Sequence, residues 1–339
     1  MVKRWNIVYF FDGTGNDRAK DETRDWSNIV RLHDSIPNDG PEGVSQWKFY
    51  GDGVGTRVNE TILGSTGGVG LEKRVQESYL HLGSVLRKAR REKVEVGIYI
   101  FGFSRGAYAA RWFAALLDFC GVPVEGCSYH EIDAAFKRQD LTAVEKARKD
   151  NKLLPLDKID MLGLFDTVQT TLFKGDFDVR ILPRIVRKCY HALAYNERRA
   201  VFPVERFSPD ADRLEEVWFL GSHSDIGGGY VERGLADLSL EWMIENARAN
   251  GLLVNDGPLP CDTAVHVEQF HNSLSKLWKW VDAVKTFRLS RDREFVEGDV
   301  FHWSARKLGT MFATMKPALP PENQIAYLDP PGDDIQGIV

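Results

Sequence analysis

Residues 102–106 read G-F-S-R-G and place a serine between two glycines, where one hydrophobic pattern gives way to another. The preceding residues 94–101 are β-branched and aromatic, as in a buried strand, whereas residues 107–117 have the composition of an apolar helix. A serine in so tight a turn takes a strained backbone conformation, and the glycines let strand and helix pack closely. The pattern predicts that Ser104 is a nucleophile. The alternative is an ordinary turn in which Ser104 only caps the helix.

A serine hydroxyl needs a base to take its proton, and two later strands end in residues that suit this chemistry. Asp166 follows a predicted strand at 159–165, and His223 follows a predicted strand at 216–220. The carboxyl ends of parallel strands share one edge, where ligands bind. We therefore expect Ser104, Asp166 and His223 to lie together, in the chain order typical of an α/β hydrolase. His223 would take the serine proton, and Asp166 would orient and stabilise the imidazolium.

Both partners of the serine have alternatives. Asp166 could cap a helix, and His223 could be a hydrogen-bonded loop residue. Asp225 is a rival for the acid, and His302, which follows a predicted strand at 299–301, is a rival for the base.

An acyl-transfer site also needs two backbone N–H donors for the developing oxyanion. The amide of Arg105 is the first candidate, because it follows the nucleophile. We expect the second donor in the glycine loop after the first strand, at Gly13 or Thr14. Asp12 in the same loop is either structural or holds a cation together with Asp225, and the sequence offers no other metal site.

Strands and helices alternate along the chain, which predicts a doubly wound, mostly parallel α/β sheet of the α/β-hydrolase type, with helical insertions near the active site. The predicted strands before the rival base are 5–11, 47–50, 94–101, 159–165 and 216–220. The predicted helices are 71–91, 107–117, 129–152, 183–199 and 236–250. His191 falls in the fourth of these helices.

The 339 residues are long for one simple domain, but their 43% hydrophobic content supports a large core. We expect a single domain over residues 1–339. Cap or insertion segments are predicted at about 120–157 and 170–210, and residues 256–339 form a C-terminal extension packed on the core.

Composition excludes several classes of protein. A net charge of −5 with scattered basic residues argues against nucleic-acid binding. The four cysteines have no metal-ligand or disulfide spacing, so we expect reduced thiols and no cofactor. The apolar run at the N-terminus is too short for a signal peptide, and no stretch is long enough to span a membrane. We expect a protein that is cytoplasmic when made.

Four motifs occur together in the order 10–16, 102–107, 165–168 and 221–230. With them, the chain resembles the type VI secretion phospholipase effectors of the GFSRG class, a grouping that also holds many uncharacterised α/β hydrolases. The resemblance covers about residues 5–255. It implies Ser104 as nucleophile, Asp166 as acid and His223 as base, and cleavage of glycerophospholipid acyl esters by toxins directed at rival cells.

The resemblance also implies partners. An effector would meet a delivery protein and a cognate immunity protein, and it would leave the cell by a route that needs no signal peptide. The chain ends soon after the predicted catalytic core, and we expect it to lack a large C-terminal membrane-targeting or delivery domain. Residues 275–289 combine aromatic residues and lysines as in an interfacial helix, which would allow peripheral contact with a membrane surface. The alternative is a helix packed on the sheet or over an acyl pocket.

A lipid substrate requires an apolar channel beside the nucleophile. Aromatic-rich insertions predict its lining as Phe119, Phe136, Leu172, Phe173 and Phe177. Two other readings stay open: a soluble carboxylesterase acting on small esters, and a catalytically idle binding module of the same fold.

Overall fold

A computed structural model describes residues 3–13, 26–51, 67–124, 127–168, 178–200, 202–210, 212–255, 271–273, 291–311 and 317–329. Its centre is an eight-stranded sheet in the order β10-β9-β8-β7-β6-β3-β1-β2, and every pairing between neighbours is parallel. The strands are β1 (Arg4–Phe11), β2 (Val44–Gly51), β3 (Glu95–Phe103), β6 (Met161–Phe165), β7 (Cys189–Ala194), β8 (Leu214–Phe219), β9 (Asp299–Phe301) and β10 (Ile325–Tyr327). The predicted parallel α/β sheet is confirmed.

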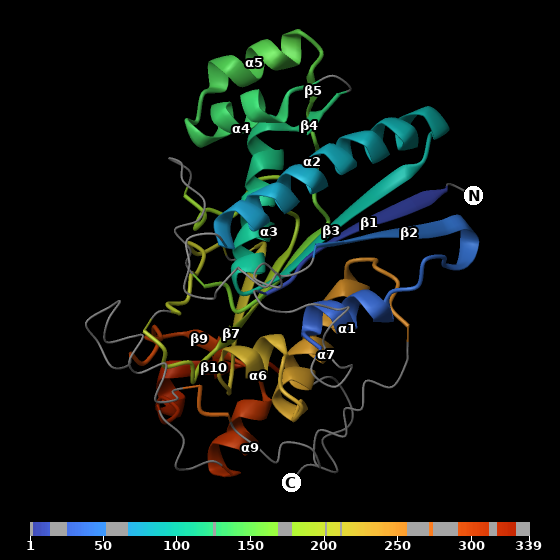
Figure 1. The fold of residues 1–339 in the computed structure, drawn as a ribbon. Helices are drawn as coiled ribbons and strands as arrows, with labels where there is room; N and C mark the ends of the chain where they lie inside the picture. Colours follow the sequence, from blue (N-terminus) through green and yellow to red (C-terminus); the bar gives the residue numbers. More distant parts are fainter. Residues whose placement is uncertain are drawn as a thin grey trace.

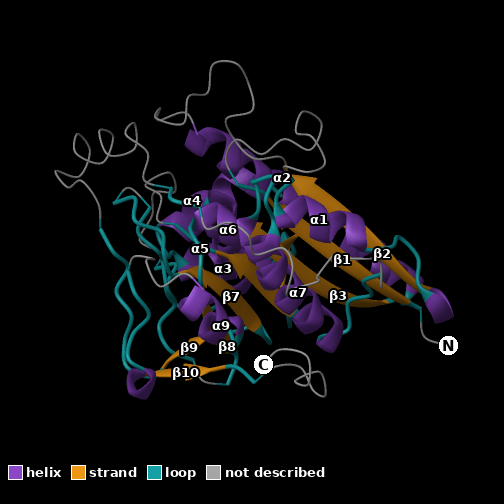
Figure 2. Cartoon of the chain, turned by 90° about the horizontal axis from the view of Figure 1, so that it is seen from below, coloured by secondary structure: helices purple, strands orange, loops and turns teal. Residues whose placement is uncertain are grey.

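Helices cover both faces of this sheet, with α2 and α3 on one side and α1 and α7 on the other (Figures 1 and 2). The α-helices are α1 (Asn28–Ser35), α2 (Gly67–Glu92), α3 (Arg105–Cys120), α4 (Tyr129–Lys137), α5 (Leu141–Lys149), α6 (His223–Gly227), α7 (Gly234–Ala249) and α9 (Ser304–Met311). Short 3-10 helices occupy η2 (Pro41–Gly43) and η3 (Glu322–Gln324), and β4 (Val122–Pro123) pairs antiparallel with β5 (Leu153–Leu154). The predicted helices at 71–91, 107–117 and 236–250 correspond to α2, α3 and α7.

Strand β1 shows why both faces are covered. Successive side chains of a strand point to opposite faces. Ile7 and Tyr9 lie in the core cluster that contains the α2 and α3 side chains, whereas Val8 and Phe10 lie in the cluster that contains the α1 and α7 side chains. All four are 1% exposed or less, so β1 carries an almost continuous apolar run.

The helix predicted at 183–199 is wrong, because this stretch contains strand β7. All six residues of β7 are buried, and a strand buried on both faces lacks the alternation that would distinguish it from a helix. His191 therefore lies in a strand, with Nδ1 2.9 Å from Glu216 Oε1 and Nε2 accepting the Thr167 amide at 3.1 Å. The strand also removes residues 189–194 from the segment 170–210 that we expected to be an insertion.

Helices α4 and α5 form a layer beyond the C-terminal part of α3 (Figure 1). Phe136 of α4 is fully buried there, with its ring centroid 5.0 Å from Trp112 and 5.9 Å from Phe119. Phe119 lies fifteen residues after Ser104 along α3, about 22 Å at the helical rise. Phe119 and Phe136 thus pack in the core and do not line a channel at Ser104. Leu172, Phe173 and Phe177 lie outside the described residues.

The described residues after 255 add two strands to one edge of the sheet. Strand β9 pairs with β8, and β10 pairs with β9. Asp299 ties β9 to the preceding strand by accepting a hydrogen bond from Trp218 Nε1 at 2.9 Å and two from Arg206 at 2.8 and 3.0 Å. None of the described helices is long and apolar enough to cross a membrane. Residues 275–289 lie outside the described part of the chain.

Candidate active site

Ser104 stands in the turn between β3 and α3 with φ 59° and ψ −127°. This is a left-handed backbone conformation that non-glycine residues rarely adopt, and it is maintained only where the surroundings enforce it. The Ser104 amide donates to Phe165 O at 3.0 Å, which fastens the turn to β6. The Ser104 side chain makes no capping hydrogen bond to α3. An ordinary capped turn therefore does not describe this residue.

The two glycines of the motif allow the turn to be this tight. A Cβ on Gly102 would lie 2.6 Å from Ala107 Cα, inside the first turn of α3. A Cβ on Gly106 would lie 2.2 Å from Phe11 O and 2.4 Å from Asp12 O. The start of α3 thus packs directly on the end of β1, and this contact brings the loop after β1 next to Ser104.

His223 and Asp166 complete a hydrogen-bonded chain with Ser104. His223 Nε2 lies 2.8 Å from Ser104 Oγ, and His223 Nδ1 lies 2.5 Å from Asp166 Oδ2. The three side chains come from separate places: the turn after β3, the end of β6 and the first residue of α6. They are 4%, 0% and 5% exposed for Ser104, Asp166 and His223. A nucleophile, a base and a group that orients the base are the parts that acyl transfer by serine requires.

Asp166 is held by more than the histidine. It has φ 41°, and its Oδ1 accepts the amide of Ala194 from β7 at 2.9 Å. Arg293 donates Nη1 to Oδ1 at 2.5 Å and Nη2 to Oδ2 at 3.0 Å. Burial by itself would raise the pKa of Asp166, but the Arg293 charge and then His223 outweigh it and hold this pKa well below its ordinary value. The carboxylate is therefore ionised.

The imidazole of His223 lies between two aromatic rings. Ring centroids are 4.7 Å away for Phe103 and 5.2 Å away for Phe202. Burial among them lowers the pKa of His223, and Asp166 opposes this shift. The His223 amide donates to Glu197 Oε2 at 3.2 Å, which fixes the backbone of the histidine. The ring is thus held in its neutral, proton-accepting form at neutral pH.

The donors expected for an oxyanion have different surroundings. The Arg105 amide is the first of α3, and it donates no hydrogen bond among those of the described residues. The Gly13 amide instead donates to Asp12 Oδ1 at 2.6 Å, so it is already occupied. A carboxylate of the same loop thus competes for this donor, and the role of Gly13 toward an oxyanion stays a prediction. Thr14 lies outside the described residues.

Asp12 ties the loop after β1 to its neighbours. Its Oδ2 accepts from Ser27 Oγ and from Tyr50 OH, each at 2.7 Å. Asp225 has separate partners: it accepts from Ser222 N and Oγ at 2.8 and 2.9 Å, which closes the capping box of α6. The described residues contain no group of three His, Cys, Asp or Glu side chains placed to hold a metal ion.

The rival residues Asp225 and His302 do not contact Ser104. Asp225 Oδ1 lies 2.6 Å from His271 Nδ1. His302 stacks on Phe219, with 4.5 Å between ring centroids, and its Nδ1 lies 2.8 Å from Ser304 Oγ. Burial lowers the pKa of His302 to about 3, which makes it a poor base.

Two site residues were missed by the sequence analysis. Arg293 stands in the charged run before β9, and no local pattern marks it as a partner of Asp166. Glu197 follows β7 and is 1% exposed. It accepts from the Arg199 side chain at 2.8 and 2.9 Å and from Ser273 Oγ at 2.9 Å. Its only local signal was an acidic residue beside two arginines at the end of an apolar run.

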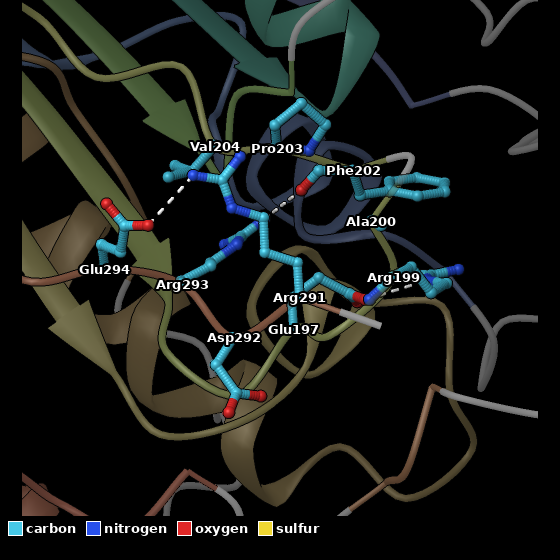
Figure 3. Close-up of a pocket in the computed structure, with 10 residues that line it drawn as sticks. All are labelled: Glu197, Arg199, Ala200, Phe202, Pro203, Val204, Arg291, Asp292, Arg293 and Glu294. Carbon is cyan, nitrogen blue, oxygen red and sulfur yellow. Dashed lines mark hydrogen bonds and ion pairs between the residues drawn. The ribbon is translucent and has the colours of Figure 1, made fainter. Parts of the chain in front are cut away.

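A cavity of about 220 Å³ opens beside these residues (Figure 3). Glu197, Phe202 and Arg293 belong to its lining, and each of them also touches His223 or Asp166. Asp166 and His223 are not part of the lining, so the cavity reaches them only through these three residues.

The parallel sheet, the strained serine between β3 and α3, and the position of His223 after β8 together define an α/β-hydrolase-like protein. Comparison with known families makes this more specific. Residues 5–246 match the model of the type VI secretion system phospholipase effector Tle1-like catalytic domain. The chain belongs to this family.

One curated protein and two solved structures are similar to parts of this chain. An uncharacterised protein of Saccharomyces cerevisiae is 26% identical in an alignment of 237 positions that covers 60% of this chain and 33% of that protein. A solved structure of an uncharacterised Pseudomonas aeruginosa protein is 22% identical with a TM-score of 0.48, covering 75% of this chain and 47% of the other. The Tle1 effector, solved bound to the VgrG spike of the type VI secretion system, is 21% identical with a TM-score of 0.41, covering 68% and 52%. The chain thus spans about a third to a half of these relatives.

Proposed function

We propose that this protein is a serine hydrolase that cleaves the acyl esters of glycerophospholipids through an acyl-enzyme. The observation that carries the proposal is the chain of hydrogen bonds from Ser104 through His223 to Asp166. Membership of a phospholipase effector family supports the choice of substrate class.

In the proposed reaction, Ser104 Oγ attacks the ester carbonyl carbon while His223 Nε2 takes the hydroxyl proton. The Arg105 amide and a second donor, for which Thr14 is our candidate, stabilise the oxyanion of the tetrahedral intermediate. His223 then gives its proton to the departing alcohol, which leaves an acyl-Ser104 ester. Water, deprotonated by the same histidine, hydrolyses this ester and restores the enzyme. Asp166 stays ionised and stabilises the imidazolium in both halves.

Labelling with a fluorophosphonate tests the nucleophile. Wild type should be labelled at Ser104, and Ser104→Ala should lose both the label and on the order of 10⁴-fold in kcat, because the covalent path is removed. Ser84→Ala is the matched control, since Ser84 is exposed on α2. If Ser104→Ala keeps activity within about tenfold of wild type, the serine mechanism is refuted.

A substrate panel tests the lipid. Each buried methylene adds roughly 0.8 kcal/mol to binding, so kcat/KM should rise from acetyl to palmitoyl esters. The protein should also cleave diacyl phospholipids presented as vesicles. A steady fall with chain length and no phospholipid cleavage would favour a small-ester carboxylesterase. If no ester is turned over and Ser104 is not labelled, the remaining interpretation is a catalytically idle binding module.

The family description also supports a proposal about partners. We infer that the protein is made in the cytoplasm, engages a type VI delivery protein, meets an immunity protein in its producer, and contacts the membrane surface peripherally. Co-purification of the chain with the VgrG spike of its own organism checks the delivery part.

A further inference from the structure

Arg293 contacts both carboxylate oxygens of Asp166, the residue that also binds His223. Its two terminal nitrogens donate to the two carboxylate oxygens, at 2.5 Å from Nη1 to Oδ1 and 3.0 Å from Nη2 to Oδ2. The same nitrogens also donate to Ala194 O at 2.7 Å and Phe202 O at 3.1 Å. The guanidinium therefore bridges the acid, the end of β7 and the loop that carries Phe202. Figure 3 shows Arg293 and Phe202 together in the lining of the cavity.

This contact is built into the interior. Arg293 is 8% exposed and Asp166 is fully buried. A guanidinium presents its donors in a planar fork that matches a carboxylate, so the pair fixes the plane of the carboxylate as well as its position. Asp166 Oδ2, shared between Arg293 and His223, is thereby aimed at the imidazole.

We propose that Arg293 is a positioning residue for ester hydrolysis, whose guanidinium fixes the Asp166 carboxylate and keeps it an anion facing His223. The inference rests on the function proposed above. It adds that a residue between α7 and β9, 127 positions from the acid in sequence, decides the geometry of the acid–base pair.

The charges around this pair determine the effect of Arg293 on pH dependence. The charged groups that face the pair of Asp166 and His223 are Glu197, which is negative, and Arg293 and Arg199, which are positive. The productive state has an ionised carboxylate and a neutral imidazole, so one added proton inactivates it wherever that proton binds. A cation beside the pair disfavours this proton. Removing the cation should therefore allow protonation at a higher pH.

The pH profile of kcat/KM on a soluble ester tests this effect. Arg293→Met should lower kcat on the order of 10²-fold through a misplaced acid, and its acidic limb should move up by about one pH unit. Arg293→Lys keeps a charge without the fork, so its acidic limb should stay near that of wild type while kcat falls. Arg291→Met is the matched control, because Arg291 is exposed and pairs with exposed Glu294. Its profile should superimpose on that of wild type.

Chemical rescue separates positioning from folding. Guanidinium ion at non-denaturing concentration should restore at least tenfold activity to Arg293→Ala, and sodium or tetramethylammonium at the same ionic strength should not. A purely structural role would leave the acidic limb of the folded Arg293→Met variant in place and give no rescue of Arg293→Ala, and this result would overturn the inference. If Arg293→Met and Arg293→Ala fail to fold, the test rests on Arg293→Lys. An unchanged kcat in that variant would show that the planar fork of guanidinium donors is not needed, which contradicts the inference. Failure of the proposed serine hydrolase function would be seen in a separate measurement, because fluorophosphonate would then not label Ser104 of the wild-type protein.

Discussion

Two buried histidines near the ends of neighbouring strands have opposite surroundings. His223 faces a hydroxyl on one ring nitrogen and a carboxylate on the other. His302 faces a hydroxyl on Nδ1 and is otherwise enclosed by rings, including those of Phe219 and Trp303. A base needs a partner that stabilises its protonated form, and of these two histidines it is His223 that has a carboxylate partner, Asp166.

Replacement of each histidine by phenylalanine should separate these roles. His223→Phe should lose at least about 10³-fold in kcat/KM, because the serine then has no base. His302→Phe keeps the stacked ring and should retain kcat/KM within about threefold, while stability falls by roughly 1 kcal/mol from the lost Ser304 contact. Ester turnover and thermal unfolding of both variants check this. Greater loss in His302→Phe would move the base to His302.

At the scale of elements, the site depends on how closely α3 approaches the end of β1. The contact has no room for a methyl group, since a Cβ on Gly106 would meet two backbone oxygens. Strand β1 is paired on both sides, so its backbone atoms cannot move without disturbing the sheet. The strained φ of Ser104 is held by this packing and by the hydrogen bond to β6.

Gly106→Ala should therefore be costly in both stability and activity. Overpacking of this kind destabilises by about 1–3 kcal/mol, and a shift of α3 would carry Ser104 away from His223. Gly51→Ala is the matched control, because a Cβ there lies 3.3 Å from the flexible Arg74 side chain and 3.5 Å from Phe10 O, an ordinary contact distance. Chemical denaturation and kcat/KM measure the two effects. Equal behaviour of both variants would contradict the role of the close approach.

At the scale of the whole molecule, segments far apart in the sequence converge on the loop after β7. Glu197 receives hydrogen bonds from Arg199, from His223 and from Ser273. Burial alone would raise the pKa of Glu197, but the Arg199 contacts outweigh it and lower this pKa from its ordinary value of 4.5 to about 2. The folded state thus binds the proton of this group more weakly than the unfolded chain does.

This shift predicts how stability depends on pH. The contribution of Glu197 is fully present above about pH 4.5 and is lost as pH falls toward about 2. Glu197→Gln should reduce the free energy of unfolding at pH 7, by on the order of 3 kcal/mol, and flatten the fall between those two pH values. Glu145→Gln, exposed on α5, is the control. Urea denaturation from pH 7 to pH 2.5 gives both curves, and parallel curves for Glu197→Gln and wild type would refute the prediction.

The sequence alone was sufficient for those features that short-range patterns encode. The strand, the G-F-S-R-G turn and the helix that follows have distinct periodicities, so the place of Ser104 could be predicted. Asp166 and His223 could be predicted as its neighbours because parallel strands bring their carboxyl ends to one edge. The parallel α/β fold followed from the same alternation.

Tertiary structure decided what depends on burial from two sides or on distant partners. Strand β7 was mistaken for a helix because both of its faces are covered, which erases the alternation that marks a strand. The Gly13 amide donates a hydrogen bond to Asp12, and this contact is visible only in the folded loop. Arg293 reaches Asp166 across 127 residues, and such a pairing is set by the order of strands in the sheet and not by any local pattern of side chains.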